Sequence, residues 1–221
     1  MKIDQSQKSS NITLTGGTVK DLSTNYEQLK VRGSVSFHQN IHTKQISTNG
    51  HCIFKYDVVA DSLKNTGVCL LKSNCDIKEI VNTGHLKLSR GQTKTIQGSG
   101  KLKVEDMIQS EKVDLIGIIQ AKKINAKQLH LKLSGKSVIE QLIVDEAFID
   151  KEKITLSLLR KKLICKYIKG GNLQISFTDA EVVEGDTVAV GKNCNIQTLY
   201  YKKSYTISPK AKVQQIIRSE K

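Results

Sequence analysis

The chain has 221 residues with a formal net charge of +14, and it contains one Pro and no Trp. A hydrophobic share of 38% and a charged share of 25% exclude a disordered chain, and no apolar run reaches the length of a membrane-spanning helix. The near-absence of Pro suits a chain made mostly of paired strands, because Pro cannot donate a hydrogen bond to a neighbouring strand.

The first residues, MKIDQSQKSSN, lack the apolar centre of a signal peptide. The five cysteines are odd in number and none forms a CxxC pair, which indicates buried thiols in a reducing compartment. We therefore expect a soluble, cytoplasmic protein with structural cysteines and a polar N-terminal tail over residues 1–11.

A glycine then returns at a nearly constant interval of about seventeen positions, within a phrase that reads NGHCIF, then TGVCLL, then TGHLKL. Apolar residues follow most of these glycines by four positions, and the same interval continues beyond them to give one column. Its eleven members are Phe37, Phe54, Leu71, Leu88, Val104, Ala121, Ile139, Leu156, Leu173, Val190 and Ile207. With 38% apolar residues, chance would fill all eleven roughly two times in a hundred thousand.

Neighbouring columns support this register. Residues two positions before the column are mostly apolar, and none of the residues directly after it is apolar, which is the period-two signature of a strand buried on one face. Further apolar columns lie four and nine positions later. The later column includes Ile46, Leu63, Ile80, Val113, Phe148, Cys165, Val182, Leu199 and Ile216.

Three short strands within one such interval cannot bury their own apolar face, so each unit must stack on its neighbours. The pattern predicts an all-β fold, a parallel β-helix of 11–12 coils over residues 12–217. The glycines are predicted to occupy corners with positive φ, and Thr/Asn pairs just before them, such as Asn65-Thr66, favour turns. Residues 218–221 would form a C-terminal tail.

Two other all-β folds fit the pattern less well. A Greek-key sandwich has no reason to keep a constant interval, and a left-handed β-helix of the hexapeptide type requires apolar positions every six residues. The pattern loosens over residues 145–170, where a seam near 148–152 could divide the coil. We predict one continuous stack, because the apolar columns pass through this region in phase.

The C-terminal stretch VEGDTVAVGKNCNIQTLYYKKSYTISPKAKVQQI resembles the bactofilins, the polymer-forming cytoskeletal proteins of bacteria, in the form found in Bacillus-like species. The resemblance covers about 35 residues and rests on three motifs: EGD-x-[VI], V-x-[VI]-G-x-x-C-x-I and S-x-x-A-x-V. The matching residues are Glu184, Gly185, Asp186, Val188, Val190, Gly191, Cys194, Ile196, Ser208, Ala211 and Val213.

This resemblance implies a right-handed, triangular β-helix that assembles end to end into filaments without nucleotide. It also implies a scaffold role in cell shape, motility or the positioning of other machinery, with the chain itself or a paralogous bactofilin as partner. The coil is about twice as long as in the shortest members, and its N-terminal tail lacks the apolar membrane-targeting residues that some members carry.

The sequence offers no catalytic, cofactor-binding or metal-binding set. His38 and His42 would need a helix to share a metal ion, and His51 and His85 have Val68 between them in the repeat. The Gly98-Ser99-Gly100 turn lacks the frame of a phosphate-binding loop. We expect no cofactor and no enzymatic activity.

A basic cluster is the one candidate contact for an anion or another partner, although a solvated outer face is the simpler explanation for it. It comprises Arg160, Lys161, Lys162 and Lys166, interleaved with Leu158, Leu159, Leu163 and Ile164. Leu159 and Ile164 fit no column, so an exposed apolar strip there would indicate a partner surface.

The end coils are the other candidate surface, because unpaired strand edges template further chains. We predict a polymerisation interface of Ile12 and Leu14 at one end and Val213, Ile216 and Ile217 at the other. The function that follows is a non-enzymatic filament-forming scaffold. The alternatives are a basic solenoid that binds nucleic acid or a polysaccharide, and a solenoid acyltransferase; few aromatic residues argue against nucleic acid.

Overall fold

The computed structural model describes residues 11–22, 26–153 and 160–219. Within these residues the chain forms thirteen β-strands and no helix. The strands are β1 (Asn11–Val19), β2 (Gln28–Phe37), β3 (Ile41–Thr48), β4 (His51–Phe54), β5 (Val58–Asn65), β6 (Val68–Asn82), β7 (His85–Gly98), β8 (Lys101–Leu133), β9 (Lys136–Lys151), β10 (Lys162–Ile175), β11 (Thr178–Val190), β12 (Asn195–Ile207) and β13 (Lys212–Arg218).

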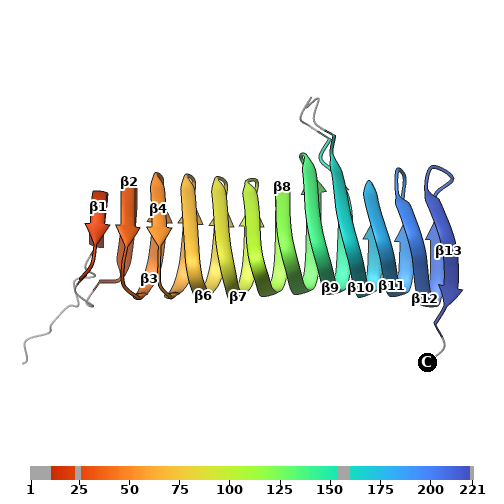
Figure 1. Ribbon diagram of the computed structural model, residues 1–221, viewed down its shortest axis with the longest axis horizontal. Coiled ribbons are helices and arrows are strands. Elements are labelled where there is room, and N and C mark those ends of the chain that lie inside the picture. Colours follow the sequence, from red (N-terminus) through yellow and green to blue (C-terminus); the bar gives the residue numbers. More distant parts are fainter. Residues whose placement is uncertain (1–10, 23–25, 154–159, 220–221) are drawn as a thin grey trace, which may run out of the picture.

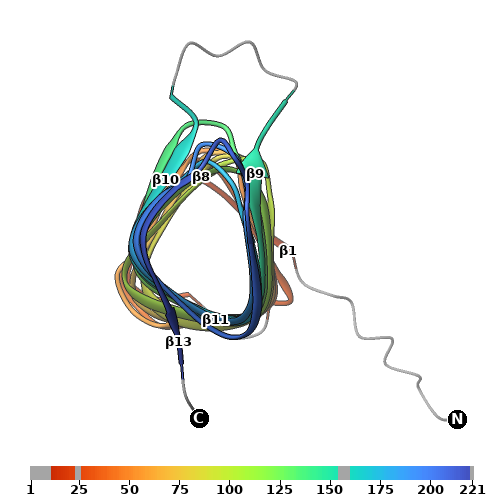
Figure 2. The ribbon, with the colours of Figure 1, turned by 90° about the vertical axis from the view of Figure 1, so that its right-hand side faces the viewer.

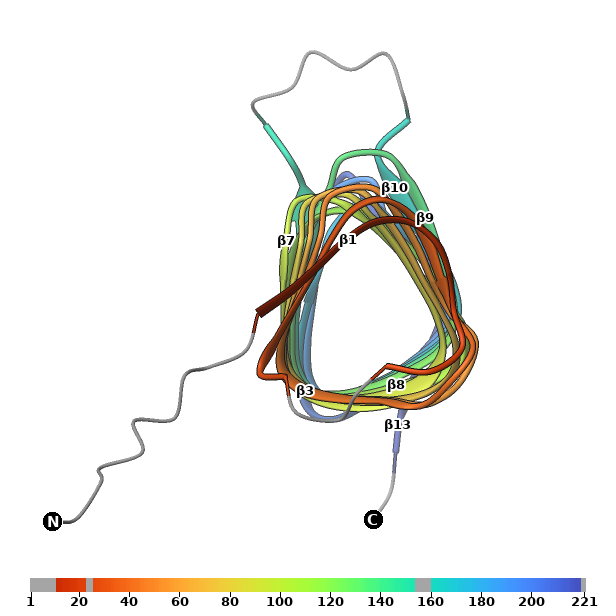
Figure 3. The ribbon, with the colours of Figure 1, turned by 90° about the vertical axis from the view of Figure 1, so that its left-hand side faces the viewer.

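All strand pairs are parallel, and each strand pairs with the strands of the adjacent coils; in the early coils β3 pairs with β2 and β5, and β4 pairs with β2 and β6. The result is a β-solenoid of about 12 coils, which Figure 1 shows as a straight rod. Figures 2 and 3 show that its cross-section is a rounded triangle. Seen from the C-terminal end in Figure 2, β13 runs down the left side of the triangle toward the C mark as the chain advances toward the viewer, so the coil turns counter-clockwise and is right-handed. The predicted fold class is confirmed.

The three sides of the triangle are called here faces A, B and C. Each coil places two inward residues on each face, and the coils stack these residues into ladders. On face A one ladder is Phe37, Phe54, Leu71, Leu88 and Val104. On face B it is Ile41, Val58, Cys75, Gly91 and Ile108. On face C it is Ile12, Leu29, Ile46, Leu63, Ile80, Ile96 and Val113.

These ladders form the core. Phe37 lies on Phe54 with ring centroids 4.8 Å apart and planes tilted by 7°, and Leu71 pairs with Phe54 on the next coil. All three are buried. The ring separation matches the spacing of adjacent strands, so the pair stacks because the backbone already holds the rings one ladder step apart. Cys52 on Cys69 follows the same rule.

The repeated glycines lie at the corner between faces C and A, but the predicted reason for them is wrong. Positive φ occurs at Gly17 and Gly98 among the described glycines, not at Gly50 or Gly67. A Cβ atom on Gly50 would stand 2.1 Å from the carbonyl oxygen of Gly33. Glycine is required here because the backbone of one coil lies against the backbone of the next. We call this corner the glycine corner.

Polar residues beside the glycine corner form a buried ladder that the sequence indicated only as turns. The Thr48 hydroxyl donates to Asn65 Oδ1 at 2.7 Å, and Asn65 Nδ2 donates to Asn82 Oδ1 at 2.7 Å. Asn82 Nδ2 then donates to the Lys101 carbonyl at 3.1 Å. All three side chains are buried, so the ladder satisfies polar groups that would otherwise destabilise the core.

The stack is continuous through the predicted seam, because β9 pairs with β10 over most of its length. The predicted phase is wrong, however. Ile139 pairs with Cys165, 26 positions later, because the chain has additional residues between β9 and β10. Leu173 lies on Val188 rather than Val190, because paired residues of β10 and β11 are fifteen positions apart instead of seventeen. Leu156, Leu158 and Leu159 lie outside the described residues.

The column nine positions after the first one is also partly wrong. Phe148 is 40% exposed on the outside of face C, against the ring of His130. The inward residue of that coil is Ala147, which lies on Leu129. Coils slightly shorter or longer than the regular interval cause this error, because a strand displaced by a single position turns the opposite side chains inward.

Candidate assembly surfaces

The N-terminal end of the solenoid is formed by β1. Its residues Ile12 and Leu14 lie on Leu29 and Val31 of β2, and both are half-buried. One edge of β1 pairs with β2, and within the described residues no strand pairs with its other edge. The two predicted residues therefore do occupy an end coil, with their outer sides uncovered.

The C-terminal end is formed by β13 and the second half of β12. Val213 lies on Ile196 and is half-buried, whereas Ile216 lies on Leu199 and is 42% exposed. Ile217 lies beside Tyr200 and is 39% exposed. The three predicted residues thus also occupy an end coil.

Two inward residues of β12 belong to the same end and were not predicted. Tyr205 lies on Val188 and Ile207 on Val190, and β13 stops pairing with β12 at Tyr201. The described chain places nothing above them, and Tyr205 is 40% exposed. The column positions of both residues were visible in the sequence, and counting to the last coil would have identified them.

Both ends of the solenoid expose the edge of a β-sheet. Each end coil has a row of backbone N–H and C=O groups along an edge with no partner in the described chain, and apolar side chains that continue the inner ladders. No helix covers either end within residues 11–22, 26–153 and 160–219. Such an edge can be extended by another strand, which would pair its backbone and cover its apolar residues.

The predicted basic cluster does not form one free patch. Lys161 is paired with Glu152 at 3.1 Å and Lys162 with Asp179 at 2.5 Å, and both lysines are largely buried. Lys166 is exposed and lies 3.7 Å from Glu140 on the outside of face A. Arg160 is exposed. Contact with an anion remains a prediction, and Lys161 and Lys162 already neutralise carboxylates within the chain.

The apolar strip that the sequence raised is present in part. Ile164 is 38% exposed and pairs with Val138, which is 36% exposed, on the outside of face A. Two residues make a small apolar surface, and isolated exposed apolar residues are normal in folded proteins.

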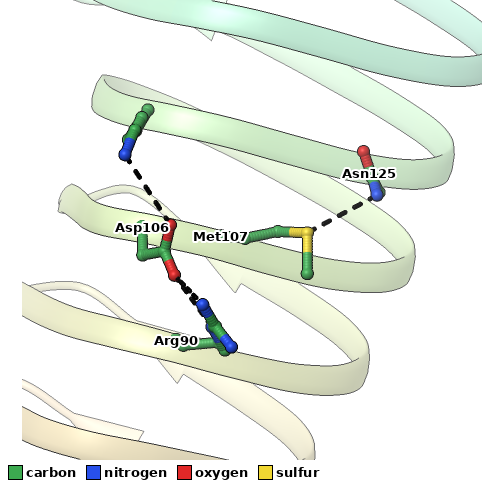
Figure 4. Close-up of polar contacts among 5 residues, drawn as sticks. Arg90, Asp106, Met107 and Asn125 are labelled. Carbon is green, nitrogen blue, oxygen red and sulfur yellow. Dashed lines mark hydrogen bonds and ion pairs between the residues drawn. The ribbon is translucent and has the colours of Figure 1, made fainter.

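The outer surface is crossed by ion pairs between successive coils. Figure 4 shows Arg90 donating to Asp106, whose other oxygen lies 4.0 Å from Lys122, and Asn125 donating to the sulfur of Met107 at 3.7 Å. The Arg90 guanidinium holds the pKa of Asp106 below its usual value. The ion pairs of Asp106 with Arg90 and Lys122 join coils and are exposed, so each contributes little to stability.

A second polar group lies in the bactofilin-like segment. Lys169 Nζ donates to Glu184 Oε1 at 2.8 Å, and the Tyr167 hydroxyl donates to Glu184 Oε2. These two bonds, with that from Lys169 the larger influence, lower the pKa of Glu184. Glu184 of the EGD motif therefore ties β11 to β10, which is a structural role.

The cysteines and histidines show no shared site in the described part of the chain. All five cysteines are buried and free, and burial raises the pKa of Cys75 and of Cys165 to about 12. His51 and His85 lie on either side of Val68 in one ladder. Among the described residues, no group of three His, Cys, Asp or Glu side chains could hold a metal ion, and no helix could cross a membrane.

Comparisons with known proteins show a partial relative. No family profile matches the chain, and no solved structure matches it. The chain is 32% identical over 96 residues to an uncharacterized protein, YhbE, of Bacillus subtilis (strain 168). The match covers 41% of this chain and 40% of YhbE, so the chain spans less than half of that relative. The bactofilin resemblance remains a prediction.

Proposed function

We propose that this chain is a structural, non-enzymatic protein whose solenoids join end to end into nucleotide-independent filaments, as the bactofilin resemblance implies. The filaments would serve as a cytoplasmic, cytoskeletal scaffold for other machinery. The partner is a second copy of the chain, with a paralogous solenoid of the same cross-section as a further candidate.

The observation that carries this proposal is the state of the two end coils. Ile216 and Tyr205 continue inner ladders of the last coils and are exposed, Ile217 is exposed on the outer side beside Tyr200, and Ile12 and Leu14 are half-buried on the first coil. Elsewhere the inward ladders are covered by the coil above. A second solenoid at either end would supply that missing cover and would pair the free edge.

The magnitudes are adequate for reversible assembly. Burying a large apolar side chain completely contributes about 1.5–3 kcal/mol. The five at one junction are already about half-buried, so covering them contributes roughly 4–7 kcal/mol. Loss of translational and rotational freedom costs about 4–15 kcal/mol. These terms are similar in size, so backbone hydrogen bonds across the junction decide the balance, and we expect assembly to depend on protein concentration.

High-speed sedimentation of the purified protein without nucleotide tests this function. We expect the pelleted fraction to rise steeply above a critical concentration and to be unchanged by added ATP or GTP. A sedimentation coefficient that stays at the monomer value throughout would reject the proposal.

The excess positive charge supports a second candidate, a solenoid that binds an anionic polymer such as nucleic acid or an acidic polysaccharide. A net charge of +14 attracts any polyanion. The two functions separate cleanly: binding of a polyanion should weaken steeply with added salt, whereas apolar junctions between end coils should persist.

A further inference from the structure

The C-terminal end of the solenoid, which Figure 2 shows from outside, is a step. The last strand, β13, lies on faces A and B and pairs with β12 only as far as Tyr201. Face C therefore ends with residues 204–207 of β12, and no described strand lies above Tyr205 and Ile207. We call the uncovered edge of residues 204–207 the C-terminal step.

The N-terminal end, shown in Figure 3, has the complementary shape. β1 begins on face C with Ile12 and Leu14 and passes to face A with Val19. In each coil the chain runs from face A to face B and then to face C, as β5 does between Val58 and Leu63. A second solenoid placed above β13 would therefore continue this path, since its β1 begins on the face that β13 leaves uncovered.

The inward side chains of the two ends match in register. With β1 of a second copy on the C-terminal step, each of its inward apolar residues would meet an inward residue of the last coils. The pairs are Ile12 on Tyr205, Leu14 on Ile207 and Val19 on Val213. All six side chains are half-buried or exposed in the single chain. The joint would thus extend three inner ladders in the same way as one coil extends the next.

The outward side chains of the same strands are also compatible. Asn11 and Thr13 of β1 would lie on Ser204 and Thr206 of β12, and all four are exposed. They are uncharged amide and hydroxyl side chains, and hydroxyl pairs on adjacent strands are favourable. No like charges would face each other in these pairs.

The charges of the ends disfavour the joining of two C-terminal ends. Residues 202–218 include five cations and no acid, whereas residues 11–27 include one cation and two acids. Lys202 and Lys203 contact Asp186 on the coil below. The other cations of the last coil, Lys210 and Lys212 with Arg218, have no ion pair within the described residues. Two C-terminal ends would bring these cations together, whereas opposite ends would not.

We propose that the solenoids join head to tail, with β1 of one copy paired to the C-terminal step of the next, so that one continuous coil runs through the filament. This inference rests on the proposed function and assigns the surfaces that meet. The two ends of such a filament differ, since one presents the C-terminal step and the other presents β1. A paralogous solenoid would join only if its first strand carried inward apolar residues on the same face.

Cysteine crosslinking tests the direction and the register together. Thr13→Cys and Thr206→Cys place thiols at outward positions that face each other across the proposed joint, one strand spacing or about 4.8 Å apart. With a short thiol-specific bifunctional reagent, the assembled double variant should form a series of covalent multimers. Each single variant should run as a monomer on a denaturing gel, because a head-to-tail joint then holds only one new thiol. The native cysteines are buried, and the wild-type protein gives their background.

The matched control keeps Thr13→Cys and moves the second thiol to Gln174→Cys. Gln174 is exposed on the outside of face C, two coils below Thr206. Its thiol would lie about three strand spacings, roughly 14 Å, from that of Thr13→Cys across the joint. A short reagent does not span this distance, so we expect at least tenfold less crosslinked product than from the first double variant. Sedimentation of every variant shows whether it still assembles.

Covalent dimers from a single variant would overturn the proposal, because two identical thiols would then meet where like ends join. Equal multimer yields from the two double variants, or no crosslinks in a Thr13→Cys/Thr206→Cys protein that sediments like wild type, would overturn the register. These results would leave end-to-end assembly intact. A wild-type protein that never sediments would instead refute the proposed function, and head-to-tail joining with it.

Discussion

Gly67 lies so close to Gly50 on the preceding coil that a Cβ atom on Gly67 would stand 2.2 Å from the Gly50 carbonyl oxygen. Neither residue has a positive φ. The corner therefore depends on the distance between two backbones, and this distance recurs from coil to coil. The glycine that first revealed the repeat is a packing residue.

Gly67→Ala should consequently lower the free energy of unfolding by about 2–3 kcal/mol, because the methyl group has backbone rather than a movable side chain in its way. Urea denaturation followed by circular dichroism measures this change. The control is Gly16→Ala, since a Cβ atom on Gly16 has its nearest contact at 3.6 Å, from Ser34 O. Equal urea midpoints for the Gly67→Ala and Gly16→Ala variants would contradict the close approach of the Gly67 and Gly50 backbones.

The buried asparagine ladder gives a second stability prediction. Asn65→Leu should destabilise the fold by about 3 kcal/mol, because it leaves the Thr48 hydroxyl and the Asn82 side chain without their partner in a buried corner. Thermal denaturation compares it with Asn49→Leu, which changes an exposed residue of the same corner. Equal melting temperatures of the Asn65→Leu and Asn49→Leu variants would contradict a stabilising role of the ladder.

The Glu184 contacts give stability a dependence on pH. The pKa of Glu184 is lowered in the folded protein, so its contribution is complete above the usual Glu pKa and is lost as pH falls through the folded value. At pH 7 we expect Glu184→Gln to be less stable than wild type by about 0.5–1 kcal/mol, and the difference should vanish near pH 3. Glu181→Gln, at an exposed position, should show no such convergence.

Charges on the end coils should prevent assembly. Ile216→Glu places a carboxylate on an edge that the junction must bury, and Ile12→Glu does so at the other end, so each should abolish pelleting. Ile116→Glu is the matched control, since Ile116 is 39% exposed on the side of the rod, and it should still form filaments. The size of the remaining particles shows which ends join. If both end variants are monomers, the N-terminal end of one solenoid joins the C-terminal end of the next. If they are dimers, like ends join.

Much of the fold was predictable because the repeat leaves a direct trace in the sequence. Phe37, Phe54, Leu71 and Leu88 stack as the regular interval requires. The prediction failed where the interval changes. Coils of β8 and β9 depart from the regular interval, so an apolar residue at a fixed count, such as Phe148, faces outward. The chain also has additional residues between β9 and β10. Counting cannot detect this, because both faces of such a strand can carry apolar residues.

Some features of the candidate surfaces were predictable from the sequence and others were not. The end coils were predictable, since the first and last members of a column have no neighbour beyond them. The pairing of Lys161 with Glu152 and of Lys162 with Asp179 was not, because it depends on which side chains a corner turns inward.

Negative-stain electron microscopy of the purified wild-type protein, with neither lipid nor nucleotide, tests end-to-end assembly most directly. Joined solenoids would appear as unbranched filaments with the diameter of a single solenoid. Their axial repeat would be near the length of about 12 coils, roughly 55–60 Å. Single rods of that length at every concentration and salt condition would contradict the account.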